Sequence, residues 1–269
     1  MNIIKFLESF SDDNFMKAPS NRRESFTHFG NIGKNLAMAS IPFGLSALAN
    51  KAAAADITPT PATPIGALQL ALTLEYLEDE FYDMGLSSGV IPLSENAGRD
   101  RKVFEQISLH ENAHVAFLIA GLGGTASPNF VAKPTFDFTA GGLFNPFGDY
   151  PTFLALAQAF EDTGVRAYKG QAANLMSTPD LLTAALQIHS VEARHASEVR
   201  RLRSQKGWIV GNDRGGLPSQ AQATYDGEQN VTQAGFNTST LFGVNAGTEA
   251  FDEPLTTQES VNIANLFIV

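Results

Sequence analysis

Two Glu-x-x-His motifs stand far apart in the sequence, at Glu111/His114 and Glu192/His195. Residues three apart lie on the same face of a helix, so the carboxylate and the imidazole of each motif can point at one metal ion. A lone glutamate stands in an apolar helical segment upstream of each motif, at Glu75 and at Glu161. The order Glu, Glu-x-x-His, Glu, Glu-x-x-His predicts a site for two metal ions inside a bundle of four helices.

Each of these six residues falls in a stripe of apolar residues spaced alternately three and four apart. The stripe of the first segment consists of Ile65, Leu68, Leu72, Glu75, Asp79, Tyr82 and Leu86. A stripe of this kind faces the interior of a helix bundle. Burying four unpaired carboxylates would cost several kcal/mol each, and a pair of divalent cations would compensate them.

The two halves of this pattern repeat one another. A shift of 86 residues places Glu75 on Glu161 and Tyr82 on Tyr168, and a shift of 81 residues places the first Glu-x-x-His motif on the second. Two helical hairpins with matching ligands predict a pseudo-twofold site, with one ion in each half and carboxylates shared between the ions.

Around these residues the chain resembles the ferritin-like superfamily. The segments LEYLEDEFYDMG, HENAHVAFL, AFEDTGVRAYKG and SVEARHASEVR are similar to the bacterial and plant ferritin-like domain family that includes desiccation-related proteins. The resemblance extends over roughly residues 64–269. It implies an all-α fold, a four-helix bundle with one long crossover connection. It also implies that Glu111 and Glu192 bridge both ions and that Glu75 and Glu161 are terminal ligands. The ligand pattern is specific for this fold and only weakly specific for an activity.

Several neighbouring residues have two interpretations. Glu78 would replace Glu75 as the ligand if the first helix were rotated, although the repeat favours Glu75. Tyr82 and Tyr168 either donate hydrogen bonds to ligands or fill the core. Asp79 either holds a ligand histidine or is neutralised by Arg166. Two further histidines, predicted to lie at the surface or to support the ligands, are His110 and His189.

Helix-capping and helix-breaking residues predict the helices that must position these side chains. Residues 56–64 form a Pro-Thr linker, and residues 65–206 form the bundle. Its helices are expected over about 65–86, which Gly85 and Gly89 help to end, 99–122, from 150 onward, and from 179 to about 206. The 27-residue crossover, 123–149, is rich in Gly, Pro and Phe, and its phenylalanines are expected to pack in the core.

The basic run after Val199 suits a helix C-terminus better than a binding surface. Residues 207–269 are predicted to form a loop-rich C-terminal extension, with a short helix over 255–267, that wraps the bundle or a neighbouring subunit in a homo-oligomer.

The first 55 residues differ from the rest. Arg22 and Arg23 precede a mildly apolar stretch, Leu36 to Ala49, and the alanines 52–55 form a candidate cleavage site. This pattern is typical of a twin-arginine export signal and predicts a periplasmic protein whose mature chain starts near Asp56. The alternative is a cytoplasmic protein with an uncleaved N-terminal extension.

The composition excludes several kinds of site and partner. The sequence has no cysteine, which excludes disulfides and iron-sulfur clusters, and its formal charge of -10 argues against a nucleic-acid or anionic membrane partner. No apolar run reaches the ~20 residues of a membrane-spanning helix.

Carboxylate-rich donors favour two Fe ions, or alternatively two Mn ions, with open positions for dioxygen or peroxide. The leading interpretation is a dinuclear centre that oxidises Fe(II) in stress protection, with no residue assigned a catalytic role. The alternatives are manganese-dependent peroxide dismutation and a non-catalytic, structural or desiccation-protective module.

Overall fold

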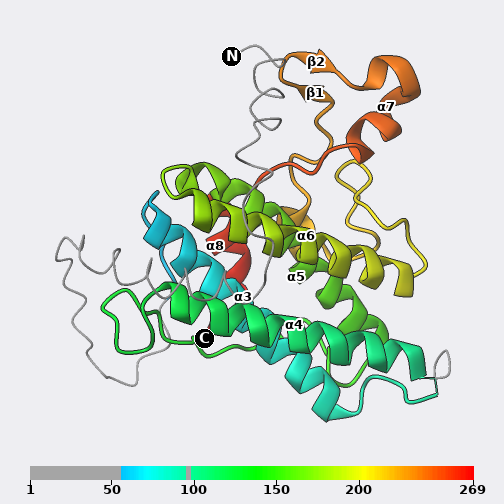
Figure 1. Ribbon diagram of the computed structural model, residues 1–269. Helices are drawn as coiled ribbons and strands as arrows, with labels where there is room; N and C mark the ends of the chain where they lie inside the picture. The colour runs from blue at the N-terminus through cyan, green and yellow to red at the C-terminus, as the bar shows by residue number, and fades with distance from the viewer. Residues whose placement is uncertain (1–55, 95–97) are drawn as a thin grey trace.

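The computed structural model describes residues 56–94 and 98–269, and four long helices dominate it (Figure 1). They are α3 (Pro64–Ser88), α4 (Arg99–Gly121), α5 (Tyr150–Gln171) and α6 (Pro179–Leu202). Helix α3 pairs with α4 and α5 pairs with α6, and these two hairpins pack on each other through α3 against α5 and α4 against α6. The predicted all-α bundle is confirmed. The proposed export signal lies outside the described residues.

Local sequence explains where the long helices begin and end. The side chain of Thr63 accepts a hydrogen bond from the Gly66 amide before α3, and Asp149 accepts one from the Thr152 amide before α5. Each of these helices has a proline in its first turn, where the missing amide hydrogen costs nothing. Helix α3 stops at Gly89, whose φ of 80° lies in the left-handed region that closes helices.

The expectation that Gly85 helps to end α3 is wrong, because this glycine lies inside the helix. A Cβ atom at Gly85 would lie 2.2 Å from Cε2 of Phe153 on α5. The glycine therefore provides close contact between two helices rather than a helix stop.

The crossover between α4 and α5 contributes aromatic residues to the core. Phe138 packs on Phe81 of α3 with ring centroids 5.3 Å apart, and Phe81 also stacks on Phe153 at 4.8 Å. These phenylalanines pack as predicted, and they hold the irregular segment against the bundle.

The C-terminal region after α6 contains more regular structure than the sequence suggests. It comprises η3 (Ser219–Thr224), the antiparallel pair β1 (Thr232–Gln233) and β2 (Phe236–Asn237), α7 (Ser239–Glu249) and α8 (Thr257–Ala264). The hairpin and α7 correct the expectation of a loop as far as residue 255. The terminal helix is shorter than the predicted 255–267.

Helix α8 lies against α3 and α5. It starts with a capping box, in which Thr256 and Glu259 exchange hydrogen bonds. Beyond it the chain pairs with the crossover, where the Asp137 amide donates to the Phe267 carbonyl at 2.8 Å and the Val269 amide donates to the Thr135 carbonyl at 3.0 Å. The end of the chain therefore closes one side of the bundle.

Within the described ranges, 56–94 and 98–269, no helix has both the length and the apolar character needed to cross a membrane.

Candidate metal centre

The six predicted ligands lie together, each near the middle of its helix and each buried. They form two groups of four whose ligand atoms lie within 4.8 Å of one another. The first group contains Glu75 and His114, and the second contains Glu161 and His195. Both groups share Glu111 and Glu192. The arrangement has the pseudo-twofold character expected from the sequence repeat.

Each histidine faces carboxylates of its own group through Nδ1. In the first group, His114 Nδ1 lies 2.9 Å from Glu111 Oε2, 3.1 Å from Glu75 Oε2 and 3.2 Å from Glu192 Oε1. In the second, His195 Nδ1 lies 2.8 Å from Glu111 Oε1 and 3.3 Å from Glu161 Oε2. One nitrogen thus stands among several oxygens from different helices.

The orientation of these atoms fits a bound cation. Several buried ligand atoms have no hydrogen-bond partner in the described part of the chain: Glu111 Oε1, Glu161 Oε2, both carboxylate oxygens of Glu192 and His195 Nδ1. Some of them lie within ion-pair distance of a histidine Nδ1 without forming a hydrogen bond with it. Donor atoms that converge on a shared volume without pairing are what a metal site requires, and such atoms are costly to bury otherwise.

Two tyrosines hold the terminal glutamates across the bundle. Tyr82 on α3 donates to Glu161 Oε1 at 2.5 Å, and Tyr168 on α5 donates to Glu75 Oε1 at 2.5 Å. Burial and then the neighbouring carboxylate raise the pKa of both hydroxyls well above their usual value, so they stay protonated and donate. The hydrogen-bonding interpretation therefore holds over the simple filling of the core.

His110 contacts one of the predicted ligands, and His189 does not reach the cluster. His110 Nδ1 lies 2.8 Å from Nε2 of His195, and its own Nε2 lies 2.8 Å from Gln106 Nε2. A partner on the outer nitrogen fixes the orientation and the proton of a ligand imidazole. His189 instead approaches the backbone of Val165.

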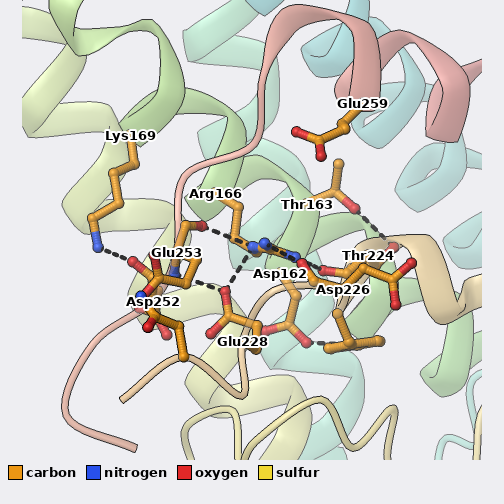
Figure 2. A network of polar contacts seen from close by, with 12 residues as sticks. Asp162, Thr163, Arg166, Lys169, Thr224, Asp226, Glu228, Asp252, Glu253 and Glu259 are labelled. Carbon is orange, nitrogen blue, oxygen red and sulfur yellow. Dashed lines mark hydrogen bonds and ion pairs between the residues drawn. The ribbon is translucent and has the colours of Figure 1, made fainter. Parts of the chain in front are cut away.

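The suggested neutralisation of Asp79 by Arg166 is wrong. Asp79 accepts a hydrogen bond from Asn112 Nδ2 at 2.7 Å. Arg166 lies elsewhere, 2.7 Å from the buried carboxylate of Glu228 (Figure 2). The sequence could not show this pairing because Glu228 belongs to the irregular C-terminal region.

Glu78 and Gly164 are two further residues at the site. Glu78 is buried beside the six residues but belongs to neither group of four. A Cβ atom at Gly164 would lie 3.0 Å from Glu192 Oε2. Gly164 was not among the predicted site residues, although the 86-residue repeat offers a signal for it by aligning this glycine with Glu78.

The cluster binds protons strongly when it holds no metal. Burial lowers the pKa of His195, but Glu161, Glu111 and Glu192 outweigh this effect and raise it to about 11. The pKa of His114 is raised for the same reasons, chiefly by Glu75 against the opposing effect of burial. Burial also raises the pKa of Glu111 to about 7. At neutral pH the imidazoles are therefore charged and partly compensate the carboxylates.

Metal binding is consequently expected to release protons and to strengthen as pH rises. A ligand imidazole must lose its proton, so below a pKa of about 11 each ion that binds His195 displaces one. Below about pH 7, protonation of Glu111 adds a second competitor and the affinity should fall more steeply. Calorimetry of Mn(II) binding in two buffers of different ionisation enthalpy measures the protons released. An affinity that stayed constant between about pH 6 and pH 8 would contradict this expectation.

Comparison with known proteins agrees with the geometry. The model of a ferritin-like domain family matches residues 63–205, which is more than half of the chain and contains all six clustered residues. No curated protein sequence matches the chain. On the family match, together with the four-helix bundle and its buried Glu and His residues, the chain belongs to the ferritin-like domain family.

Proposed function

We propose that this cluster binds two iron ions and that the protein oxidises Fe(II) with dioxygen or peroxide as the electron acceptor, in protection against stress. The observation that carries the proposal is the pair of four-residue groups sharing Glu111 and Glu192. Three carboxylates and one imidazole in each group form a hard, oxygen-rich donor set, which suits iron or manganese better than zinc or copper. Two ions in such groups would be bridged by the shared carboxylates.

Each side chain has a definite task in this proposal. Glu111 and Glu192 would hold both ions, while Glu75, His114, Glu161 and His195 would each hold one. Tyr82 and Tyr168 fix the terminal carboxylates, and His110 fixes the ring of His195. The surrounding apolar residues exclude bulk water, which strengthens the attraction between ligands and cations. Iron bound here would supply the electrons that reduce the acceptor.

Metal analysis and a turnover assay test the proposal together. Protein purified without a metal-affinity resin is expected to contain iron, and to oxidise added Fe(II) faster than the same solution without protein. The variant Glu111→Gln/Glu192→Gln keeps the size of both bridging side chains and removes their charge, so it should lose this activity. Bound manganese with rapid peroxide breakdown would favour dismutation instead. Bound metal without turnover, whose chelation only lowers the melting temperature, would favour a structural or desiccation-protective role.

The export route remains a proposal that rests on the sequence. We propose that the chain folds and acquires its metal in the cytoplasm, and then leaves through the twin-arginine route to the periplasm. The evidence is the Arg22-Arg23 pair, the apolar stretch and the alanines before Asp56. N-terminal sequencing of the native protein decides the matter. A terminus at Met1 or Asn2 would show that the first 55 residues are kept.

A further inference from the structure

A seventh acidic side chain, Glu78, lies beside the cluster. It stands one turn after Glu75 on α3 and is 3% exposed. Glu78 borders a small cavity between α3, α5 and α8, whose wall also includes Gly164 and Ile263. No hydrogen bond or ion pair links Glu78 to any other described residue. A buried carboxyl group without a partner is costly, and a bound cation is one way to compensate it.

Gly164 provides the space for this carboxyl group. A Cβ atom at Gly164 would lie 3.3 Å from Glu78 Oε1 as well as 3.0 Å from Glu192 Oε2. Any other residue would therefore push against two carboxylates at once. The missing side chain brings Glu78 and Glu192 toward the same part of α5.

This pair of residues breaks the symmetry of the repeat. The shift of 86 residues that places Glu75 on Glu161 and Tyr82 on Tyr168 places Glu78 on Gly164. One half of the site thus has an additional carboxylate, and the other half has a glycine in its place. The two ions of such a site cannot have the same surroundings.

The position of Gly164 indicates which of the two ions Glu78 would bind. Gly164 lies one turn after Glu161 on the same face of α5, next to Glu192. Glu161 belongs only to the group that contains His195, whereas Glu192 belongs to both groups.

We propose that Glu78 is a further ligand of the ion held by Glu161 and His195, which makes the two ions inequivalent. The ion of this group would have five protein ligands: Glu78, Glu111, Glu161, Glu192 and His195. The other ion would have four and would keep more open positions for an exogenous acceptor. The additional negative ligand makes the five-ligand position the tighter one, which fills first. This inference rests on the proposed binding of two ions and adds which position is the stronger.

Stepwise titration with Mn(II), followed by electron paramagnetic resonance and equilibrium dialysis, tests the inference without any turnover assay. The wild-type protein is expected to bind one ion more tightly than the other. Glu78→Gln keeps the shape of the side chain and removes its charge, and it should weaken the tighter site at least tenfold while leaving the weaker site within about twofold. Glu80→Gln is the matched control, because Glu80 lies on the same helix and pairs with the surface residue Lys133. It should leave both affinities unchanged.

A second variant separates a ligand from a structural residue. Glu78→Met keeps the length of the side chain, so the metal-free protein should melt no lower than the wild type, while the tighter site is lost. If Glu78→Met lowers the melting temperature of the metal-free protein as much as that of the metal-bound protein, the inference is overturned. If Glu78→Gln binds both Mn(II) ions with the affinities of the wild-type protein, the inference is also overturned, and the proposed function still stands. A wild-type protein that binds no metal would overturn both.

Discussion

Replacing His114 and His195 together with alanine is expected to abolish metal binding while leaving most of the helical content intact. Each group of four loses its imidazole, so its three carboxylates, joined in one half by the proposed ligand Glu78, must then hold the ion without a nitrogen ligand. The helices depend instead on packing away from the site, through fully buried residues such as Leu72, Phe81 and Phe104. Metal analysis after dialysis measures the loss, and circular dichroism measures the helical content.

His189→Ala is the matched control for this double variant. His189 lies on α6 with His195 but outside both groups of four, so its removal should leave the metal content at the wild-type level. The double variant should also melt lower when metal-free, because each charged imidazole compensates buried carboxylates and breaking a buried ion pair costs about 3–5 kcal/mol. Two metal ions per chain retained after both histidines are gone would show that the ligands are misassigned.

The four helices and the clustering of six side chains could be predicted because both follow from local periodicity. Stripes spaced three and four apart define which helix face is buried, and Glu-x-x-His places two ligands on that face. The helix starts predicted near residues 65 and 150 agree with the structure, in which α3 begins at Pro64 and α5 at Tyr150. The repeat then selected Glu75 over Glu78, and Glu75 lies in a group of four whereas Glu78 does not.

Contacts between segments far apart in the chain could not be read in the same way. Nothing local to Gly85 shows that the Phe153 ring packs against it, so the sequence around this glycine predicts a helix end. Helix α7 has little amphipathic pattern and contains Gly243 with a left-handed φ of 86°, which makes it resemble a loop.

The basic run at the end of α6 also makes a contact with a distant segment that local sequence does not reveal. The sequence predicts a helix end, and α6 does end at Leu202, but Arg200 is buried. Its guanidinium donates to both carboxylate oxygens of Asp162 on α5, at 3.1 and 2.5 Å. An ion pair between two helices, rather than only the helix dipole, therefore explains this arginine.

A second buried arginine attaches the C-terminal region to the bundle. Arg166 on α5 is 1% exposed. Its Nε lies 2.7 Å from Glu228 Oε1 and donates to the Glu253 carbonyl at 2.8 Å, and its two Nη atoms donate to the carbonyls of Thr224 and Asp226 (Figure 2). The Glu253 amide in turn donates to Glu228 Oε1 at 2.7 Å. One guanidinium thus joins two separate stretches of the C-terminal region to a helix that carries a predicted metal ligand.

Arg166→Met is therefore expected to be among the most destabilising single substitutions in the bundle. Methionine fills much of the same volume, but it leaves the Glu228 carboxylate and three carbonyl groups buried without their donor. Removing one partner of a buried ion pair costs about 3–5 kcal/mol. For a chain of this size that corresponds to a fall in melting temperature of roughly 10 °C. Arg101→Met is the control, since Arg101 makes only a solvent-accessible pair with Glu105 one turn away and a long hydrogen bond, 3.4 Å, to the Leu86 carbonyl. This substitution should cost no more than about 1 kcal/mol.

The double variant Arg166→Met/Glu228→Leu separates the missing charge from the missing hydrogen bonds. With no carboxylate left unpaired, it should recover part of the stability lost in Arg166→Met, and the difference between the two measures the cost of the isolated charge. In Arg166→Met, hydrogen exchange should lose protection first at the amides of Glu253 and Leu255. In the wild-type structure the Glu253 amide donates to Glu228 and the Leu255 amide donates to the Arg166 carbonyl. Early exchange there, with slow exchange kept in α3 and α4, would mean that the C-terminal region detaches before the bundle unfolds. Simultaneous exchange throughout would instead mean that this region and the four helices form one cooperative unit, since the guanidinium would then stabilise all of them together.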